Sequence, residues 1–204
     1  MTNKQLFINN IAPVIKRIAG ERGYKYAGAI IAQAAIESAW FYGSQLSKKY
    51  YNLFGMKCGS KWTGKSVNMA TKEEYTAGTL TTIKDNFRAY NSLEEGINGY
   101  FDFIESMSRY SNLKTAASAY DYIEKLKADG WATSSTYVTN LKKTYNANNF
   151  SQYDGITTVA TEISDAEKAL AQDVIAGKYG NGDARKDNIY KAVQRAVNAQ
   201  LSRS

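Results

Sequence analysis

The stretch Tyr24–Trp40, YKYAGAIIAQAAIESAW, would be apolar on almost every face of a helix. Within residues 27–39 the only polar side chains are those of Gln33, Glu37 and Ser38. A helix of this length that is apolar all round belongs in a protein core rather than on a surface. We therefore expect a buried central helix around which the rest of the chain is organised.

Glu37 is the one acidic side chain of this helix. Burial disfavours the charged form of a carboxyl group, so an unpaired glutamate here has a raised pKa and holds a proton near neutral pH. A general acid needs such a proton. The residues also allow another interpretation, in which Glu37 lies in water at the C-terminal rim of the helix or pairs with a lysine.

The composition indicates a folded protein with an anionic partner. Of 204 residues, 44% are hydrophobic and 22% charged, which suits one medium domain and a small appendage. The net charge of +7 fits nucleic acid, a teichoic-acid-bearing cell wall or an anionic membrane. No run of five Lys or Arg occurs, so the basic tail of many nucleic-acid binders is missing. No apolar run resembles a signal peptide or a membrane span, which predicts a cytosolic protein without membrane insertion.

The absent residue types exclude several chemistries. The chain has no His and a single Cys, Cys58. Ser-His and Cys-His nucleophile systems and the usual His-containing zinc sites cannot be assembled. Carboxylates remain, and glycoside hydrolysis is the leading reaction that carboxylates run without metal or thiol. We therefore expect no metal and no cofactor, and we interpret Cys58 as a small, buried or half-buried residue rather than a reactive thiol.

Apolar spacing and turn residues predict the other elements. Ser92 and Glu95 form the S-x-x-E pattern of a capping box at the start of a helix. Short β-type runs between residues 65 and 90, separated by the turn KEEYTAG, predict a β-hairpin or a small three-stranded sheet carrying Glu73 and Glu74. Paired acids there are more often solvated surface charge than a site. Further helices are predicted over residues 3–19 (kinked or split at Pro13), 92–104, 116–127 and 134–145.

The segment from Trp40 to Gly55 is aromatic and punctuated by glycine. Such rings stack on the apolar faces of sugars as readily as they fill a core, and core packing is the commoner role for any one ring. We expect this segment to form one wall of a cleft, with Trp40 among the substrate-binding residues.

The chain divides into two modules. Residues 146–161 lose helical periodicity and turn polar and small, which indicates a linker over 148–163 between a domain at 1–147 and a unit at 164–204. From Ile156 onward the charges sum to +1, so the first module carries the other +6. About forty residues are marginal as an independent fold.

The first module resembles the glucosaminidase domain of glycoside hydrolase family 73, whose members cut peptidoglycan. The resemblance covers roughly Phe7 to Leu141 and rests on AQAAIESAW, YNLFGMK, TKEEY, FRAYNSLEEGINGYFDFI and GWATSSTYVTNL, in that order. It implies a mostly helical, lysozyme-like domain with a small β-hairpin lobe, so the fold class is α+β, mostly α. Where family members often read ESGWG, this chain has Ala39 and Phe41, which leaves the loop after the acid less flexible.

The resemblance also assigns residues. Glu37 is implied as the general acid and Glu74 as the second acidic residue, with its neighbour Glu73 in reserve. A carboxyl buried among apolar groups stays protonated while one on a polar hairpin stays ionised, which gives the two groups different roles. Tyr137 is implied to assist at the site, and the YNLFG loop to line the cleft through Asn52 and Phe54.

The second module resembles a short cell-wall-binding repeat of certain phage lysozymes. The matching runs are ALAQDVIAGKYGNGDAR at Ala169–Arg185 and AVQRAVN at Ala192–Asn198. By resemblance its ligand is the disaccharide-peptide unit of peptidoglycan. The implied contacts are Gly180, Asn181, Gly182 and Arg185, and for the glycines a tight turn is an equal explanation.

Together these observations predict a peptidoglycan hydrolase that cuts the GlcNAc-β-1,4-MurNAc bond. Retaining, inverting and substrate-assisted mechanisms all stay open. The missing leader favours a phage endolysin, held in the host cytoplasm until a holin releases it, over a secreted autolysin acting outside the cell. Three alternatives remain: a muramidase or lytic transglycosylase, a wall-binding phage protein without turnover, and a basic nucleic-acid binder, which gains only from the net charge.

Overall fold

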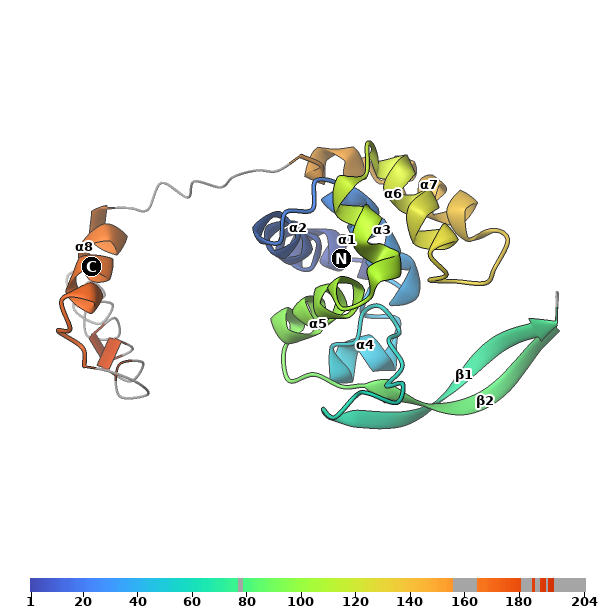
Figure 1. Ribbon diagram of the computed structural model, residues 1–204, viewed down its shortest axis with the longest axis horizontal. Coiled ribbons are helices and arrows are strands. Elements are labelled where there is room, and N and C mark those ends of the chain that lie inside the picture. The colour runs from blue at the N-terminus through green and yellow to red at the C-terminus, as the bar shows by residue number, and fades with distance from the viewer. Residues whose placement is uncertain (77–78, 156–164, 181–184, 186–187, 190, 193–204) are drawn as a thin grey trace. The chain divides into compact units, whose positions relative to one another are not determined.

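The computed structural model describes residues 1–76, 79–155, 165–180, 185, 188–189 and 191–192. The chain forms two compact units, Met1–Ile156 and Thr157–Ser204, coloured blue to orange and orange to red in Figure 1. The described part of the first unit is mostly helical with one antiparallel hairpin, which confirms the α+β, mostly α prediction. None of the described helices combines the length and apolar character that a membrane crossing demands.

The helices and strands follow one another in a simple order. The α-helices of the first unit are α1 (Asn3–Asn10), α2 (Ala12–Glu21), α3 (Ala27–Glu37), α4 (Gln45–Tyr50), α5 (Leu93–Glu105), α6 (Ala119–Ala128) and α7 (Tyr137–Ala147). Two 3-10 helices, η1 (Ser108–Thr115) and η2 (Phe150–Tyr153), join them, and the second unit contains α8 (Asp165–Ile175). The sequence pattern did not predict α4 or η1, which are short and lack an extended apolar stripe.

Helix α3 forms the centre of the first unit, as its composition predicts. Every residue from Ala27 to Ala35 is buried, and α2, α6, α7 and η2 all contact the helix. Its small side chains allow close approach: a Cβ added at Gly28 would lie 2.2 Å from the carbonyl oxygen of Phe150. Glycine is therefore required at this position because neighbouring backbone occupies the space of a side chain.

The first unit extends beyond the predicted boundary at residue 147. Phe150 is 0% exposed, and the carboxylate of Asp154 accepts hydrogen bonds from the Gly28 backbone N–H at 2.8 Å and from the Tyr145 hydroxyl. Residues 148–155 thus belong to the packed unit rather than to a linker, because an apolar ring and a carboxylate anchor this polar segment to α3. Of the predicted linker, residues 156–163 lie outside the described residues.

The hairpin consists of β1 (Ser66–Thr76) and β2 (Thr79–Arg88), paired antiparallel from Ser66 opposite Arg88 to Thr76 opposite Thr79. It has two strands, one of the two arrangements predicted. Strand β1 extends to Thr76, within the expected KEEYTAG turn, so Glu73 and Glu74 are strand residues. Figure 1 shows that the base of the hairpin adjoins the helices while its closed end stands clear of them.

The buried side chain of Asn52 joins the hairpin base to the preceding loop. Its Nδ2 donates to the carbonyl oxygens of Met56 at 2.8 Å and Arg88 at 2.9 Å, and its Oδ1 accepts from the Met56 N–H at 2.9 Å. The Arg88 N–H in turn donates to the Met56 carbonyl at 2.9 Å. The buried amide of Asn52 makes all of these hydrogen bonds, and together they fix the loop and the hairpin in one arrangement.

Helix starts follow the local sequence rules with one difference. Pro13 lies in the first turn of α2, and the predicted split falls at Ile11 between α1 and α2. Ser92 caps α5, since its hydroxyl accepts from the Glu95 N–H at 3.1 Å. The Glu95 carboxylate, however, accepts from the Asn91 N–H at 3.0 Å, so only half of the predicted capping box forms.

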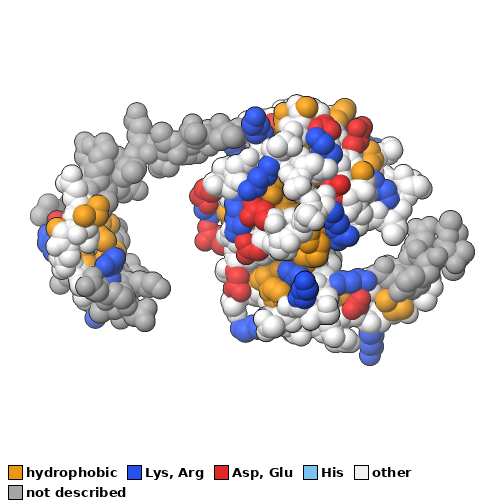
Figure 2. Space-filling model, viewed as in Figure 1, with side chains coloured by type: hydrophobic (Ala, Val, Ile, Leu, Met, Phe, Trp, Pro, Cys, Tyr) orange, Lys and Arg blue, Asp and Glu red, His pale blue; other side chains and the backbone are white. Residues whose placement is uncertain are grey.

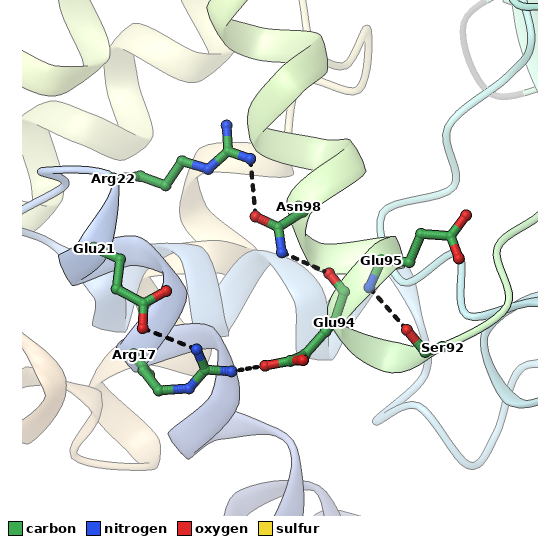
Figure 3. A network of polar contacts seen from close by, with 7 residues as sticks. All are labelled: Arg17, Glu21, Arg22, Ser92, Glu94, Glu95 and Asn98. Carbon is green, nitrogen blue, oxygen red and sulfur yellow. Dashed lines mark hydrogen bonds and ion pairs between the residues drawn. The ribbon is translucent and has the colours of Figure 1, made fainter. Parts of the chain in front are cut away.

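Charged side chains on the surface of the first unit pair with one another. In Figure 3, Arg17 contacts Glu21 at 2.8 Å within α2 and also Glu94 on α5, while Arg22 donates to Asn98 at 2.8 Å. Figure 2 shows acidic and basic side chains interspersed on the face viewed. Exposed pairs of this kind each contribute only about 0–1 kcal/mol. They align α2 with α5 but do not hold the fold together.

We predict that Phe150→Ala lowers the free energy of unfolding of the first unit by about 3–5 kcal/mol, because it leaves a cavity beside α3. Denaturant unfolding followed by tryptophan fluorescence measures this change, since all three Trp residues lie in the first unit. The matched control is Gln152→Ala on the exposed side of η2, for which we expect a change within about 0.5 kcal/mol. Equal stability of the two variants would contradict the assignment of residues 148–155 to the packed unit.

Candidate active site

Glu37 is the last residue of α3, and a tight turn follows it. The Ser38 hydroxyl donates to the Ala34 carbonyl and accepts from the Phe41 N–H at 2.7 Å. Ala39, Trp40 and Phe41 have φ values of 47°, 63° and 65°, all in the left-handed region. Such backbone costs a non-glycine residue about 1–2 kcal/mol. The helix thus ends abruptly at its acid, and strain is stored in residues 39–41.

Two donors from the far end of the sequence meet one oxygen of Glu37. Its Oε1 accepts a hydrogen bond from the Tyr137 hydroxyl at 2.9 Å and another from the Trp131 indole Nε1 at 3.1 Å. Tyr137 begins α7, and Trp131 follows Gly130 in the loop between α6 and α7. The structure thus brings Tyr137, a predicted site residue, into contact with Glu37. Trp131 was not singled out, although it belongs to the same motif and its indole is a donor.

The surroundings of Glu37 shift its proton equilibrium. Burial raises the pKa of the carboxyl group, and this effect exceeds the opposing influence of the Tyr137 and Trp131 hydrogen bonds, which lower the pKa. Burial and the charge of Glu37 together raise the pKa of the Tyr137 hydroxyl, so it remains a donor. The Glu37 carboxyl therefore holds its proton more tightly than an exposed glutamate does, which is the direction that a general acid requires.

A cleft of about 1080 Å³ lies beside Glu37. Its wall comprises the end of α3, the loop at residues 54–61, the hairpin base, the segment from α5 into η1, and residues 130–137. Phe54 lines this cleft and stacks on Tyr100 with ring centroids 3.9 Å apart. Glu37 is the only acidic side chain among the described residues that line it. A long open cleft with aromatic walls suits a polymeric sugar chain.

The structure places two predicted substrate-binding residues away from this cleft. The Trp40 ring packs edge-on against the Phe7 ring, with centroids 5.6 Å apart, and its centroid lies 6.4 Å from that of the Phe150 ring. Asn52 is 1% exposed and uses its amide group within the loop at the hairpin base. Neither is among the residues that line the cleft. Both serve the fold here, because the left-handed turn directs Trp40 toward the core and the loop needs the amide of Asn52.

The second predicted acid lies on the hairpin. The backbone of Glu74 is in β1 opposite Leu80, three residues after the cleft-lining Thr71. The side chains of Glu73 and Glu74 lie outside the part of the structure that is described. Their catalytic role therefore stays a prediction.

The described residues of the second unit include two of the four implied ligand contacts. Gly177 and Gly180 have φ values of 77° and 79°, and the Arg185 Nε donates to the Gly180 carbonyl at 2.9 Å. These left-handed positions require glycine for the turn itself. Asn181 and Gly182 lie outside the described residues.

No group of three or more His, Cys, Asp or Glu side chains in the described ranges is arranged to hold a metal ion.

Comparison with known families gives two matches. A family model described as mannosyl-glycoprotein endo-beta-N-acetylglucosaminidase matches residues 12–150, more than half of the chain. A CW_7 repeat model matches residues 168–201. The two matches follow the order of the two compact units.

Individual relatives agree with the first match. The chain is 33% identical over 137 residues to peptidoglycan hydrolase FlgJ of Pseudomonas aeruginosa. This match covers 64% of this chain and 33% of that protein. It is 31% identical over 170 residues to a probable N-acetylmuramidase of Lactococcus lactis subsp. lactis, covering 78% of this chain and 37% of that protein. The chain thus spans about a third of the length of these curated relatives.

A solved structure resembles the first unit as a whole. It is a peptidoglycan hydrolase mutant from Sphingomonas sp. A1, with a TM-score of 0.64 and 31% sequence identity. The match covers 73% of this chain and 97% of that one. Most of the fold is therefore shared with this peptidoglycan hydrolase.

We predict that Ala39→Gly raises the free energy of unfolding by about 0.5–1 kcal/mol, because glycine adopts the left-handed backbone without the steric cost that alanine incurs. The matched control is Ala128→Gly at the exposed end of α6, where helical backbone makes glycine unfavourable by at most about 1 kcal/mol. Denaturant unfolding of both variants provides the measurement. If Ala39→Gly lowered the free energy of unfolding as much as Ala128→Gly does, this would contradict the presence of backbone strain at Ala39.

The raised pKa of Glu37 predicts a pH-dependent stability difference. The folded state holds the Glu37 proton more tightly than the unfolded chain, so the ionised carboxyl destabilises the fold above its raised pKa. This penalty disappears below the unfolded pKa, where both states are protonated. We therefore expect Glu37→Gln to be more stable than the wild type at neutral pH, with the difference vanishing in acid.

Thermal or denaturant unfolding across pH measures this difference. Glu124→Gln on the exposed face of α6 controls for the loss of one negative charge. A Glu37→Gln variant that is less stable than the wild type at neutral pH would show that the two hydrogen bonds outweigh burial.

Proposed function

The chain belongs to the glucosaminidase family of glycoside hydrolases over residues 12–150, and on this basis we propose that it is a peptidoglycan hydrolase cutting the GlcNAc-β-1,4-MurNAc bond. The observation that carries the proposal is the partly buried Glu37 carboxyl, which has a raised pKa, two fixed donors and an open cleft beside it. Relatives named as peptidoglycan hydrolases support the substrate class.

Glu37 acts as the general acid in this proposal. Its Oε1 accepts from both Trp131 and Tyr137, so the proton of the neutral carboxyl resides on Oε2, the oxygen that those donors leave available. From there it passes to the glycosidic oxygen as the bond breaks, and the departing sugar leaves as an alcohol. The two donors then stabilise the carboxylate that forms, so they also lower the energy of the product state.

The positive charge that develops on the other sugar needs a second partner. Because Glu37 is the only acid among the described cleft-lining residues, Glu74 on the hairpin or the 2-acetamido group of the substrate takes this role. Glu74 would activate water or stabilise the oxocarbenium-like transition state, and Glu73 is its reserve. The acetamido group would instead attack as an internal nucleophile, leaving Glu74 to orient it.

The second unit supports action on intact cell walls. The CW_7 match over residues 168–201 follows the hydrolase domain, and a tethered wall-binding module raises the local concentration of substrate. We extend the proposal to a phage endolysin that a holin releases to the wall. A secreted enzyme would use the same two modules in the same way.

Digestion of purified peptidoglycan by wild type and Glu37→Gln tests the proposal, with borohydride reduction and mass spectrometry of the products. We expect reduced GlcNAc ends from the wild type and a loss of about 10²–10⁴-fold in kcat for the variant, because a general acid contributes this much. Glu21→Gln, an exposed acid on α2, is the control and should match the wild type.

The products also separate the alternatives. Reduced MurNAc ends would indicate a muramidase, which the name of the Lactococcus lactis relative makes a specific alternative. A 1,6-anhydro product would indicate a lytic transglycosylase. Wall binding without release of any ends would identify a binding protein, and unchanged turnover by Glu37→Gln would remove the acid from the mechanism.

A further inference from the structure

The cleft beside Glu37 is strongly basic. Its described lining residues include four cationic side chains, Lys57, Lys61, Arg88 and Arg109. The only acidic one is Glu37, whose pKa is raised by burial. The sugars of a neutral glycan do not require such a charge.

Three of these cations have no carboxylate partner in the described structure. Lys57 pairs with Asp85 at 3.0 Å, whereas no ion pair within the described residues involves Lys61, Arg88 or Arg109. Elsewhere on the first unit some basic side chains pair with the protein's own acids, as Arg17 does with Glu21 and Glu94 in Figure 3, while Lys48 and Lys143 are exposed and also have no ion pair within the described residues. Cations that line a cleft without internal counter-ions are available to an anionic ligand.

Arg88 is held in a fixed orientation. Its guanidinium carbon lies 4.5 Å from the Trp62 ring centroid and 5.0 Å from that of Phe103, and its Nε donates to the Lys57 carbonyl at 3.2 Å. Stacking of this kind positions the planar group before a ligand arrives. Less side-chain entropy is then lost on binding.

Arg109 lies close to the catalytic end of the cleft. Its guanidinium carbon is 4.8 Å from the Tyr110 ring centroid, and its Nη2 contacts the Met107 sulfur at 3.5 Å. Its Nη1 would be 3.9 Å from a Cβ built at Gly130, the residue before Trp131. Because Trp131 donates to Glu37, this cation lies along the same wall as the proposed acid.

We propose that Lys61, Arg88 and Arg109 form a subsite that binds carboxylates attached to the glycan strand undergoing cleavage. Carboxylate is the anion that guanidinium groups bind in bidentate geometry. This inference rests on the proposed function, because a peptidoglycan strand carries such groups while a chitin-like strand does not. They come from two sources: the stem peptides, or the lactyl group of MurNAc once its peptide has been removed.

Steady-state cleavage by wild type, Lys61→Gln, Arg109→Gln and the double variant tests the subsite. Three soluble strands serve as substrates: peptide-bearing strands, the same strands with carboxylates coupled to neutral amides, and amidase-stripped strands with free lactyl carboxylates. Lys143→Gln on α7 is the matched control, since it removes one exposed cation that does not line the cleft. Arg88 is left intact because it also packs against two rings.

On peptide-bearing strands we expect kcat/KM of the double variant to fall about tenfold, because hydrogen bonds to a charged group are lost. Most of this fall should come from a higher KM. On amidated strands it should equal the wild type, and Lys143→Gln should equal the wild type on all three. A loss on stripped strands would assign the lactyl carboxylate as ligand. A loss confined to peptide-bearing strands would assign the stem peptide.

Two results would overturn the subsite. The first is an equal loss on native and amidated strands, which would indicate a disturbed fold or glycan contact. The second is an equal loss for Lys143→Gln, which would indicate attraction by the net charge alone. Failure of the wild type to release reducing ends from every strand would instead overturn the proposed hydrolase function, and with it the substrate of the subsite.

Discussion

The two hydrogen bonds that converge on one oxygen of Glu37 connect the parts of the molecule that make the site. They join the end of the buried helix α3 to the α6–α7 loop through Trp131 and to α7 through Tyr137. A carboxyl group in such surroundings costs free energy when ionised. The hydrogen bonds from Trp131 and Tyr137 reduce the cost of ionising Glu37 without removing it. The cost that remains raises the pKa of Glu37. Packing and chemistry thus depend on the same contacts.

A second polar layer lies within the core near this site. The Tyr100 hydroxyl donates to the Gln33 side-chain oxygen at 2.8 Å and lies 2.9 Å from the Tyr122 hydroxyl. All three residues are buried, and burial raises the pKa of both phenols, so they stay neutral. Gln33 is one helical turn before Glu37 on α3. Hydrogen-bonded polar groups of this kind impose one arrangement on a core that apolar packing alone would leave less specific.

The cleft combines two walls with different origins. The helical wall supplies Glu37 and its donors, while the hairpin base supplies Arg88 and is held in place by the buried amide of Asn52. Several charges on the outer surface pair with each other, whereas three cations of the cleft have no ion pair within the described residues. The surface pairs align helices at little energetic value. The cleft cations that have no ion pair in the described part of the structure are the ones that we propose bind the substrate.

The sequence by itself determined the buried helix, its acid, the split at Pro13 and the hairpin, because helical periodicity, turn residues and motif order are local properties of the chain. Only the tertiary structure decided which residues meet. Trp131 and Tyr137 are 94 and 100 positions from Glu37, and no local pattern encodes their convergence. The same holds for Trp40, which is half-buried against Phe7 rather than in the cleft, for Asn52, which is buried, and for Phe150, whose burial extends the first unit to Ile156. An aromatic or amide side chain suits a core and a cleft equally well, and only the packing around it selects one.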